Sequence, residues 1–112
     1  MSSSVRVICD LHFEGDRLPT DVFHAHASTL MEELYKLDEC DDRIADALVS
    51  SDAGKAVMTV EMFVAASDPF EASELALGII RTALHAAGAY TGGWPISHLA
   101  NQTRNASDLI DA

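Results

Sequence analysis

Alternating apolar and polar residues near the beginning of the chain predict a half-buried strand over residues 5–14. One face of this strand is apolar throughout: Val5, Val7, Cys9, Leu11 and Phe13. The other face carries polar side chains and one isoleucine: Arg6, Ile8, Asp10, His12 and Glu14. Successive side chains of a strand point to opposite sides of the sheet. We therefore expect the apolar face in the core and the polar face away from it, with the strand ending near Gly15.

The next segment has apolar residues at intervals of three or four, which predicts a helix from about Thr20 to Leu37. Its apolar face comprises Phe23, Ala27, Leu30, Leu34 and Leu37. Residues 44–50 and 57–65 then read as two strands joined by a polar turn, in which Gly54 should supply a positive φ. The alternative is that the first helix continues through Asp42 to Leu48.

A second helix has clear signals at both ends. Asp68 is placed to cap it, Pro69 occupies the first helical position, and Glu71 follows three residues after the cap. Gly88 stands where a left-handed residue ends many helices. Gly78, in the middle of this helix, suggests a close backbone contact, because glycine costs a helix about 1 kcal/mol relative to alanine.

The pattern becomes weak after residue 88. Residues 89–91 form a candidate short edge strand, which precedes the sequence Gly92-Gly93-Trp94-Pro95. We therefore expect a disordered N-terminus (1–4), one domain (5–94) and a polar C-terminal tail (95–112).

The predicted order of strand, helix, hairpin, helix and short or irregular strand is the βαββαβ arrangement of ferredoxin-like domains, an α+β fold. Right-handed crossovers place both helices on one face of a four-stranded antiparallel sheet, in a two-layer sandwich with the first and third strands central. Residues 37–47 and 68–88, together with the hairpin between them, resemble small actinobacterial proteins of unknown function with a ferredoxin-like fold. That resemblance covers residues 5–94 and brings no catalytic motif with it.

The chain of 112 residues has 7 basic and 18 acidic side chains, a formal net charge of -11. This charge repels phosphate backbones and anionic membrane surfaces, so we expect neither nucleic acid nor membrane as a partner. No apolar run approaches the length of a membrane span, and Cys9 and Cys40 lack metal-binding spacing. The sequence predicts a cytoplasmic protein with free thiols and no metal or cofactor.

Three polar residues of the central strands should share the uncovered face of the sheet: Asp10, His12 and Glu61. A carboxylate beside an imidazole can raise its pKa, poise a general base or bind a divalent ion. The alternative is a solvated polar face or a network of ion pairs at a dimer interface. Phe63 lies on the same predicted face, and Trp94 either caps the end of the sheet or anchors a ligand or partner.

The uncovered face should also expose Ile8, Val57 and Phe63. Apolar area of this kind favours self-association, so we expect a small acidic interaction module that forms a homodimer through its sheet, not an enzyme. Two alternatives remain open at this point. One is a small-molecule sensor or enzyme that uses Asp10, His12 and Glu61, and the other is an acidic inhibitor of a basic protein.

Overall fold

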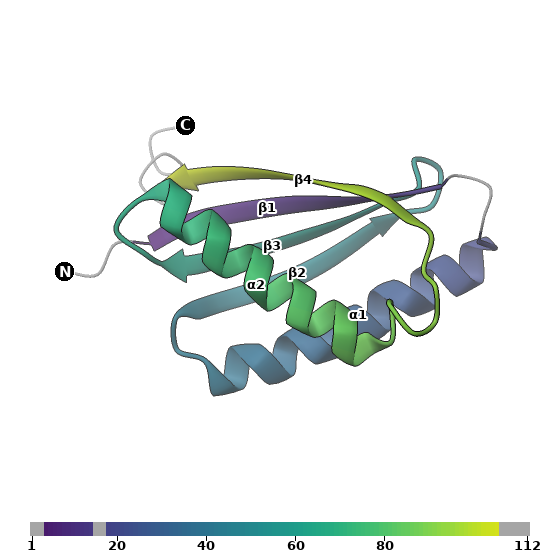
Figure 1. Ribbon diagram of the computed structural model, residues 1–112, viewed down its shortest axis with the longest axis horizontal. Coiled ribbons are helices and arrows are strands. Elements are labelled where there is room, and N and C mark those ends of the chain that lie inside the picture. Colours follow the sequence, from purple (N-terminus) through teal and green to yellow (C-terminus); the bar gives the residue numbers. More distant parts are fainter. Residues whose placement is uncertain (1–3, 15–17, 106–112) are drawn as a thin grey trace.

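In the computed structural model, the described residues form four strands and two helices in the order strand, helix, strand, strand, helix, strand (Figure 1). It describes residues 4–14 and 18–105. The elements are β1 (Ser4–Phe13), α1 (Thr20–Cys40), β2 (Ile44–Asp52), β3 (Val57–Ala65), α2 (Pro69–Ala87) and β4 (Ile96–Asn105). The predicted α+β, ferredoxin-like arrangement is confirmed.

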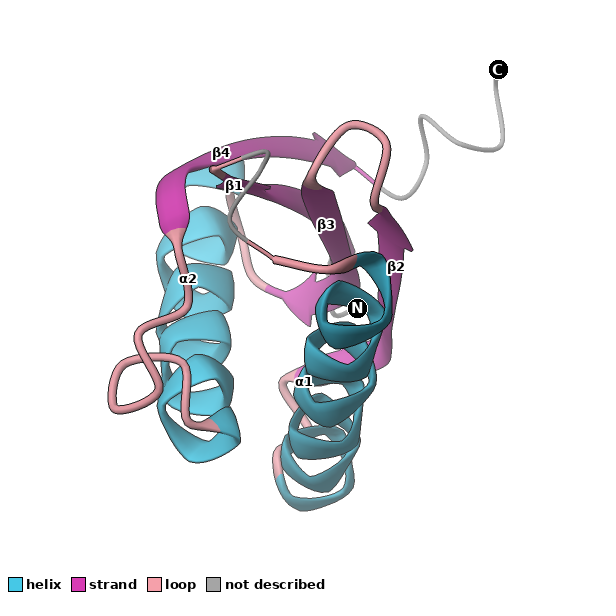
Figure 2. Cartoon of the chain, turned by 90° about the vertical axis from the view of Figure 1, so that its right-hand side faces the viewer, coloured by secondary structure: helices cyan, strands magenta, loops and turns pink. Residues whose placement is uncertain are grey.

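The strands form one sheet in the order β2-β3-β1-β4, and all neighbouring pairs are antiparallel. β1 and β3 are therefore central, as the sequence predicted. Both helices lie on the same side of the curved sheet (Figure 2). No described helix covers the opposite side, which we call the open face.

The core lies between the sheet and the helices. The apolar side of β1 faces it, and Val5, Val7, Cys9 and Leu11 are at most 1% exposed. From the helix layer, α1 buries Phe23, Ala27, Leu30 and Leu34, while α2 buries a more alanine-rich face. The small side chains of α2 allow its axis to approach the sheet closely. Among the described residues no polar or charged residue is buried, so the core is held by apolar packing alone.

The two ends of α2 follow the chemistry read from the sequence. The Asp68 carboxylate accepts a hydrogen bond of 2.9 Å from the backbone N–H of Glu71, and Pro69 is the first helical residue. Gly88 ends the helix with a left-handed φ of 87°. Gly78 differs from expectation, since a Cβ at this position would meet nothing within 4 Å. The expectation of a close backbone contact there is wrong.

The alternative of a longer first helix is also wrong, because α1 ends at Cys40. The Asp41 carboxylate accepts hydrogen bonds from the backbone N–H and the guanidinium of Arg43, and this local pairing turns the chain into β2. In the β2–β3 turn, the positive φ belongs to Ala56 and not to Gly54.

The last strand departs most from the sequence-based expectation. Residues 89–91 lie in a turn held by hydrogen bonds from Ala89 N–H to Leu84 O and from Gly92 N–H to Gly88 O. The fourth strand is instead β4, ten residues long, within the segment expected to be a polar tail. Residues 1–3 of the expected disordered N-terminus and residues 106–112 of the tail lie outside the described residues, and Ser4 already belongs to β1.

Candidate functional site

Four of the five candidate residues lie on the open face of the two central strands. In the register of β1 and β3, Asp10 is opposite Thr59 and His12 is opposite Val57, while Glu61 is opposite Ile8 and Phe63 is opposite Arg6. All eight of these residues are half-buried. The alternation of β1 and β3 thus places the candidate residues on one surface.

The two carboxylates of this surface have separate partners. Thr59 Oγ1 donates a hydrogen bond of 2.8 Å to Asp10 Oδ1. Arg6 Nη2 donates to Glu61 Oε2 at 2.8 Å, a cross-strand ion pair. The structure therefore does not gather Asp10, His12 and Glu61 around one point.

His12 contacts a residue that the sequence reading missed. Its imidazole stacks on that of His98, with ring centroids 4.2 Å apart and planes 7° apart. The two residues are opposite each other on β1 and β4. Ser97, next to His98, donates from Oγ to the His12 carbonyl oxygen at 3.0 Å. A strand predicted at residues 96–105 would have placed His98 on the sheet. The polar composition of this segment concealed that strand.

Apolar side chains lie among these polar groups on the open face. Ile8, Val57 and Phe63 are half-buried on the central strands, and Leu48, on β2 opposite Glu61, is 47% exposed. The polar groups between them bond to one another within the same face. A surface of this kind combines apolar contact area with polar groups that already have partners.

Trp94 lies on the helix side of the sheet. Its indole stacks on the imidazole of His26 from α1, with centroids 4.2 Å apart and planes 17° apart, and its centroid is 6.4 Å from the ring of Phe13. Burial lowers the pKa of His26 below its ordinary value of 6.5, because desolvation disfavours the imidazolium. The environment of the ring beneath Trp94 therefore favours its neutral form. His24, two residues earlier, contacts Ser51 Oγ through Nδ1 at 2.6 Å.

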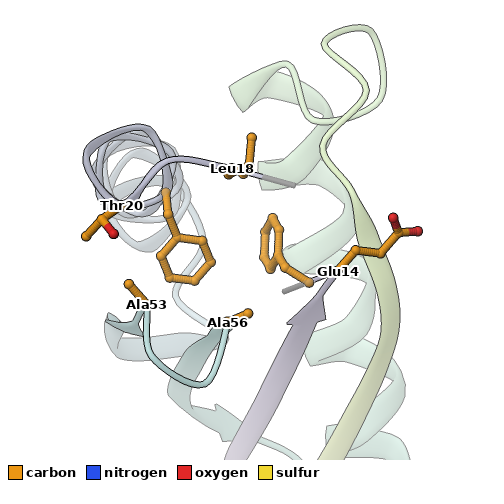
Figure 3. Close-up of a pocket in the computed structure, with 7 residues that line it drawn as sticks. Glu14, Leu18, Thr20, Ala53 and Ala56 are labelled. Carbon is orange, nitrogen blue, oxygen red and sulfur yellow. The ribbon is translucent and has the colours of Figure 1, made fainter. Parts of the chain in front are cut away.

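On the helix side of the sheet, the described residues line two cavities. One, of about 90 Å³, lies where the end of β1, the start of α1 and the β2–β3 turn meet, with Leu18, Ala53 and Ala56 around it (Figure 3). The other, of about 230 Å³, lies between the end of α2 and β4. Its lining is almost entirely apolar and aromatic: Leu84, Ala89, Tyr90, Trp94, Ile96 and Leu99.

The described residues contain no group of three or more His, Cys, Asp or Glu side chains that could hold a metal ion. Both cysteines are free thiols. Cys9 is buried, and desolvation together with the neighbouring Asp10 raises the pKa of its thiol to about 11. Within 4–14 and 18–105 there is no helix with the length and apolar character needed to cross a membrane.

Comparison with known proteins shows the fold and no family. No protein-family model and no curated protein matches this chain. Among solved structures, this chain is similar to a dimeric ferredoxin-like protein of unknown function from Thermobifida fusca. The two are 17% identical with a TM-score of 0.58, and the match covers 94% of this chain and 92% of that chain. A second dimeric protein of unknown function with a ferredoxin-like fold, from Bacteroides fragilis, has 12% identity, coverage of 91% and 95%, and a TM-score of 0.63.

A third similar structure is a "putative antibiotic biosynthesis monooxygenase" from Caulobacter crescentus, with 12% identity, coverage of 94% and 91%, and a TM-score of 0.54. At these identities the likeness establishes the ferredoxin-like fold. One of the three proteins comes from an actinobacterium, so a specific relationship to actinobacterial proteins stays a prediction.

Proposed function

We propose that this protein is a small interaction module that forms a homodimer by pairing the open faces of two sheets. The observation that carries the proposal is the composition of this face. Ile8, Val57 and Phe63 lie on the central strands among polar groups that are already bonded to one another. Burying such a face removes apolar area from water and leaves few polar groups without a partner.

The similar structures support a homodimer. The proteins from Thermobifida fusca and Bacteroides fragilis share the ferredoxin-like fold and are dimeric. In our proposal, Asp10, His12, Glu61 and Phe63 are interface residues. The two free cysteines, Cys9 and Cys40, are in keeping with a reducing cytoplasm as the place where the dimer forms.

The net charge gives the proposed dimer a distinctive response to salt. Two copies that each carry a formal charge of -11 repel one another at long range. Salt screens this repulsion, while the apolar contact does not depend on it. Raising the salt concentration from 50 to 500 mM should therefore tighten the dimer.

Light scattering after size exclusion tests the proposal with a matched pair of variants. The wild-type protein at micromolar concentration should have twice the 12.0 kDa mass of the chain. Phe63→Glu should shift the mass to that of the monomer, because it replaces a half-buried apolar side chain of the open face with a charged one. Phe70→Glu makes the same change at a residue of α2 that is 74% exposed, and it should leave the dimer intact.

Two results would contradict this proposal. One is a wild-type protein that stays monomeric at all salt concentrations. The other is a dimer that withstands Phe63→Glu, which would move the contact to an edge strand. Circular dichroism of both variants establishes that each one is folded before its mass is interpreted.

A further inference from the structure

The cavity between α2 and β4 has the size and lining of a small-molecule site, and it lies on the opposite side of the sheet from the proposed dimer face. Its volume is about 230 Å³. A protein cavity of about 150 Å³ lined by apolar side chains is known to hold benzene. The space between α2 and β4, which is open to solvent beside the exposed Tyr90 and Leu99, is large enough for one substituted ring.

One aromatic wall of the cavity, Trp94, is held in place by contacts within the chain. Trp94 is fixed by its stack on His26 and by a hydrogen bond of 2.9 Å from its backbone N–H to Ala89 O. The turn before it is tight, because a Cβ on Gly92 would lie 2.7 Å from the carbonyl oxygen of Gly88. Walls that are already ordered lower the entropic cost of binding.

The rim adds one polar group to this apolar space. Tyr90 is 57% exposed and lines the cavity together with Trp94. Tyrosine and tryptophan offer flat apolar faces and a hydrogen-bonding edge. The net charge of -11 disfavours anionic ligands.

We propose that this cavity binds a small, planar, uncharged aromatic molecule against Trp94. Leu84 and Ile96 contribute apolar side chains to its lining, and Leu99 lines it from β4, where it is 36% exposed. The inference does not depend on dimer formation, because none of these residues belongs to the open face.

The chain has one tryptophan, so its indole N–H gives one resonance in a ¹⁵N-correlation NMR spectrum and reports directly on the cavity. We expect phenol to shift this resonance in a saturable manner. Cyclohexanol, a ring of the same size with the same hydroxyl group but without a flat face, should bind at least tenfold more weakly. The monomeric Phe63→Glu variant should bind phenol as the wild type does.

A filling substitution and its matched control complete the test. Leu99→Phe should occupy the cavity and weaken phenol binding at least tenfold, whereas Leu48→Phe, on the other edge strand, should change it by less than twofold. If Leu99→Phe unfolds, Tyr90→Ser at the exposed rim replaces it and should also weaken binding.

Three results would overturn the inference. They are the absence of a saturable shift, equal binding of cyclohexanol, and a Trp94 resonance of the monomeric Phe63→Glu variant that shifts with protein concentration in the absence of phenol. The last result would mean that a second copy of the chain fills the cavity.

Discussion

The imidazoles of His12 and His98 stack with their centroids 4.2 Å apart and their planes 7° apart, which joins the central strand β1 to the edge strand β4. Stacked aromatic pairs contribute about 0.5–1.5 kcal/mol beyond the area they bury. A double-mutant cycle with His12→Ala and His98→Ala should therefore give a favourable coupling free energy of about 1 kcal/mol, measured by urea unfolding.

A control cycle pairs His12 with His24, which is on α1 and contacts Ser51. Its two substitutions should be additive within about 0.5 kcal/mol, because the residues lie in different layers and share no partner. If the substitutions of His12 and His98 are just as additive, the stack does not help to hold β4 against β1.

A glycine inside α2 and the glycine that follows its last residue should respond to alanine in opposite directions. Gly78 is exposed in the middle of α2 with open space around its Cα, so Gly78→Ala should raise the free energy of unfolding by about 1 kcal/mol. Gly88 has a φ of 87° at the end of α2. Gly88→Ala should lower the free energy of unfolding by about 1–2 kcal/mol, because a residue with a Cβ is strained at this φ. Thermal and urea unfolding measure both changes, and shifts of the same sign would contradict the argument.

The parts of the fold that the sequence predicted depend on local chemistry. Asp68, Pro69 and Gly88 define the ends of α2 through interactions within a few residues of one another. The alternation of β1 and β3 is visible because the core buries one complete side of each strand. Such signals need no knowledge of the rest of the molecule.

The parts that the sequence could not predict depend on distant contacts. β4 is rich in polar residues, and it is a strand because the backbone of β1 pairs with it over its whole length. The contacts of Trp94 with His26 and of His12 with His98 join segments that are far apart in the chain. The partners of Asp10 and Glu61 likewise became visible only once the register of β1 and β3 was known.

The two cysteines should differ sharply in reactivity. Cys40 is exposed, whereas the buried thiol of Cys9 has a pKa raised to about 11. Thiolates are the nucleophilic form of cysteine, so iodoacetamide at pH 8 should modify Cys40 alone in the folded protein and both cysteines in urea. Mass spectrometry of the digested protein identifies the modified residue, and rapid labelling of Cys9 in the folded state would contradict its burial.

Because the pKa of Cys9 is raised in the folded protein, the free energy of unfolding should decrease at alkaline pH. Between about pH 9 and 11 the unfolded chain loses the Cys9 proton while the folded protein keeps it. The unfolded state then binds fewer protons, so the free energy of unfolding falls as pH rises, by at most about 1.4 kcal/mol per pH unit. Cys9→Ala should remove this part of the slope, and Cys40→Ala should retain it.

His26 should make the free energy of unfolding decrease at acidic pH, because its pKa is lowered in the folded protein. Burial against Trp94 lowers its pKa below 6.5 in the folded protein, so as pH falls the unfolded chain takes up this proton first. The contribution of neutral His26 to the free energy of unfolding is thus fully present above about pH 6.5. It is lost as the pH falls towards the pKa of His26 in the folded protein. His26→Phe keeps a ring beneath the indole but cannot be protonated. Urea unfolding at pH 7.5 and 5.0 should show a smaller loss of stability for this variant than for the wild type, and equal losses would show that the burial of His26 does not affect its protonation.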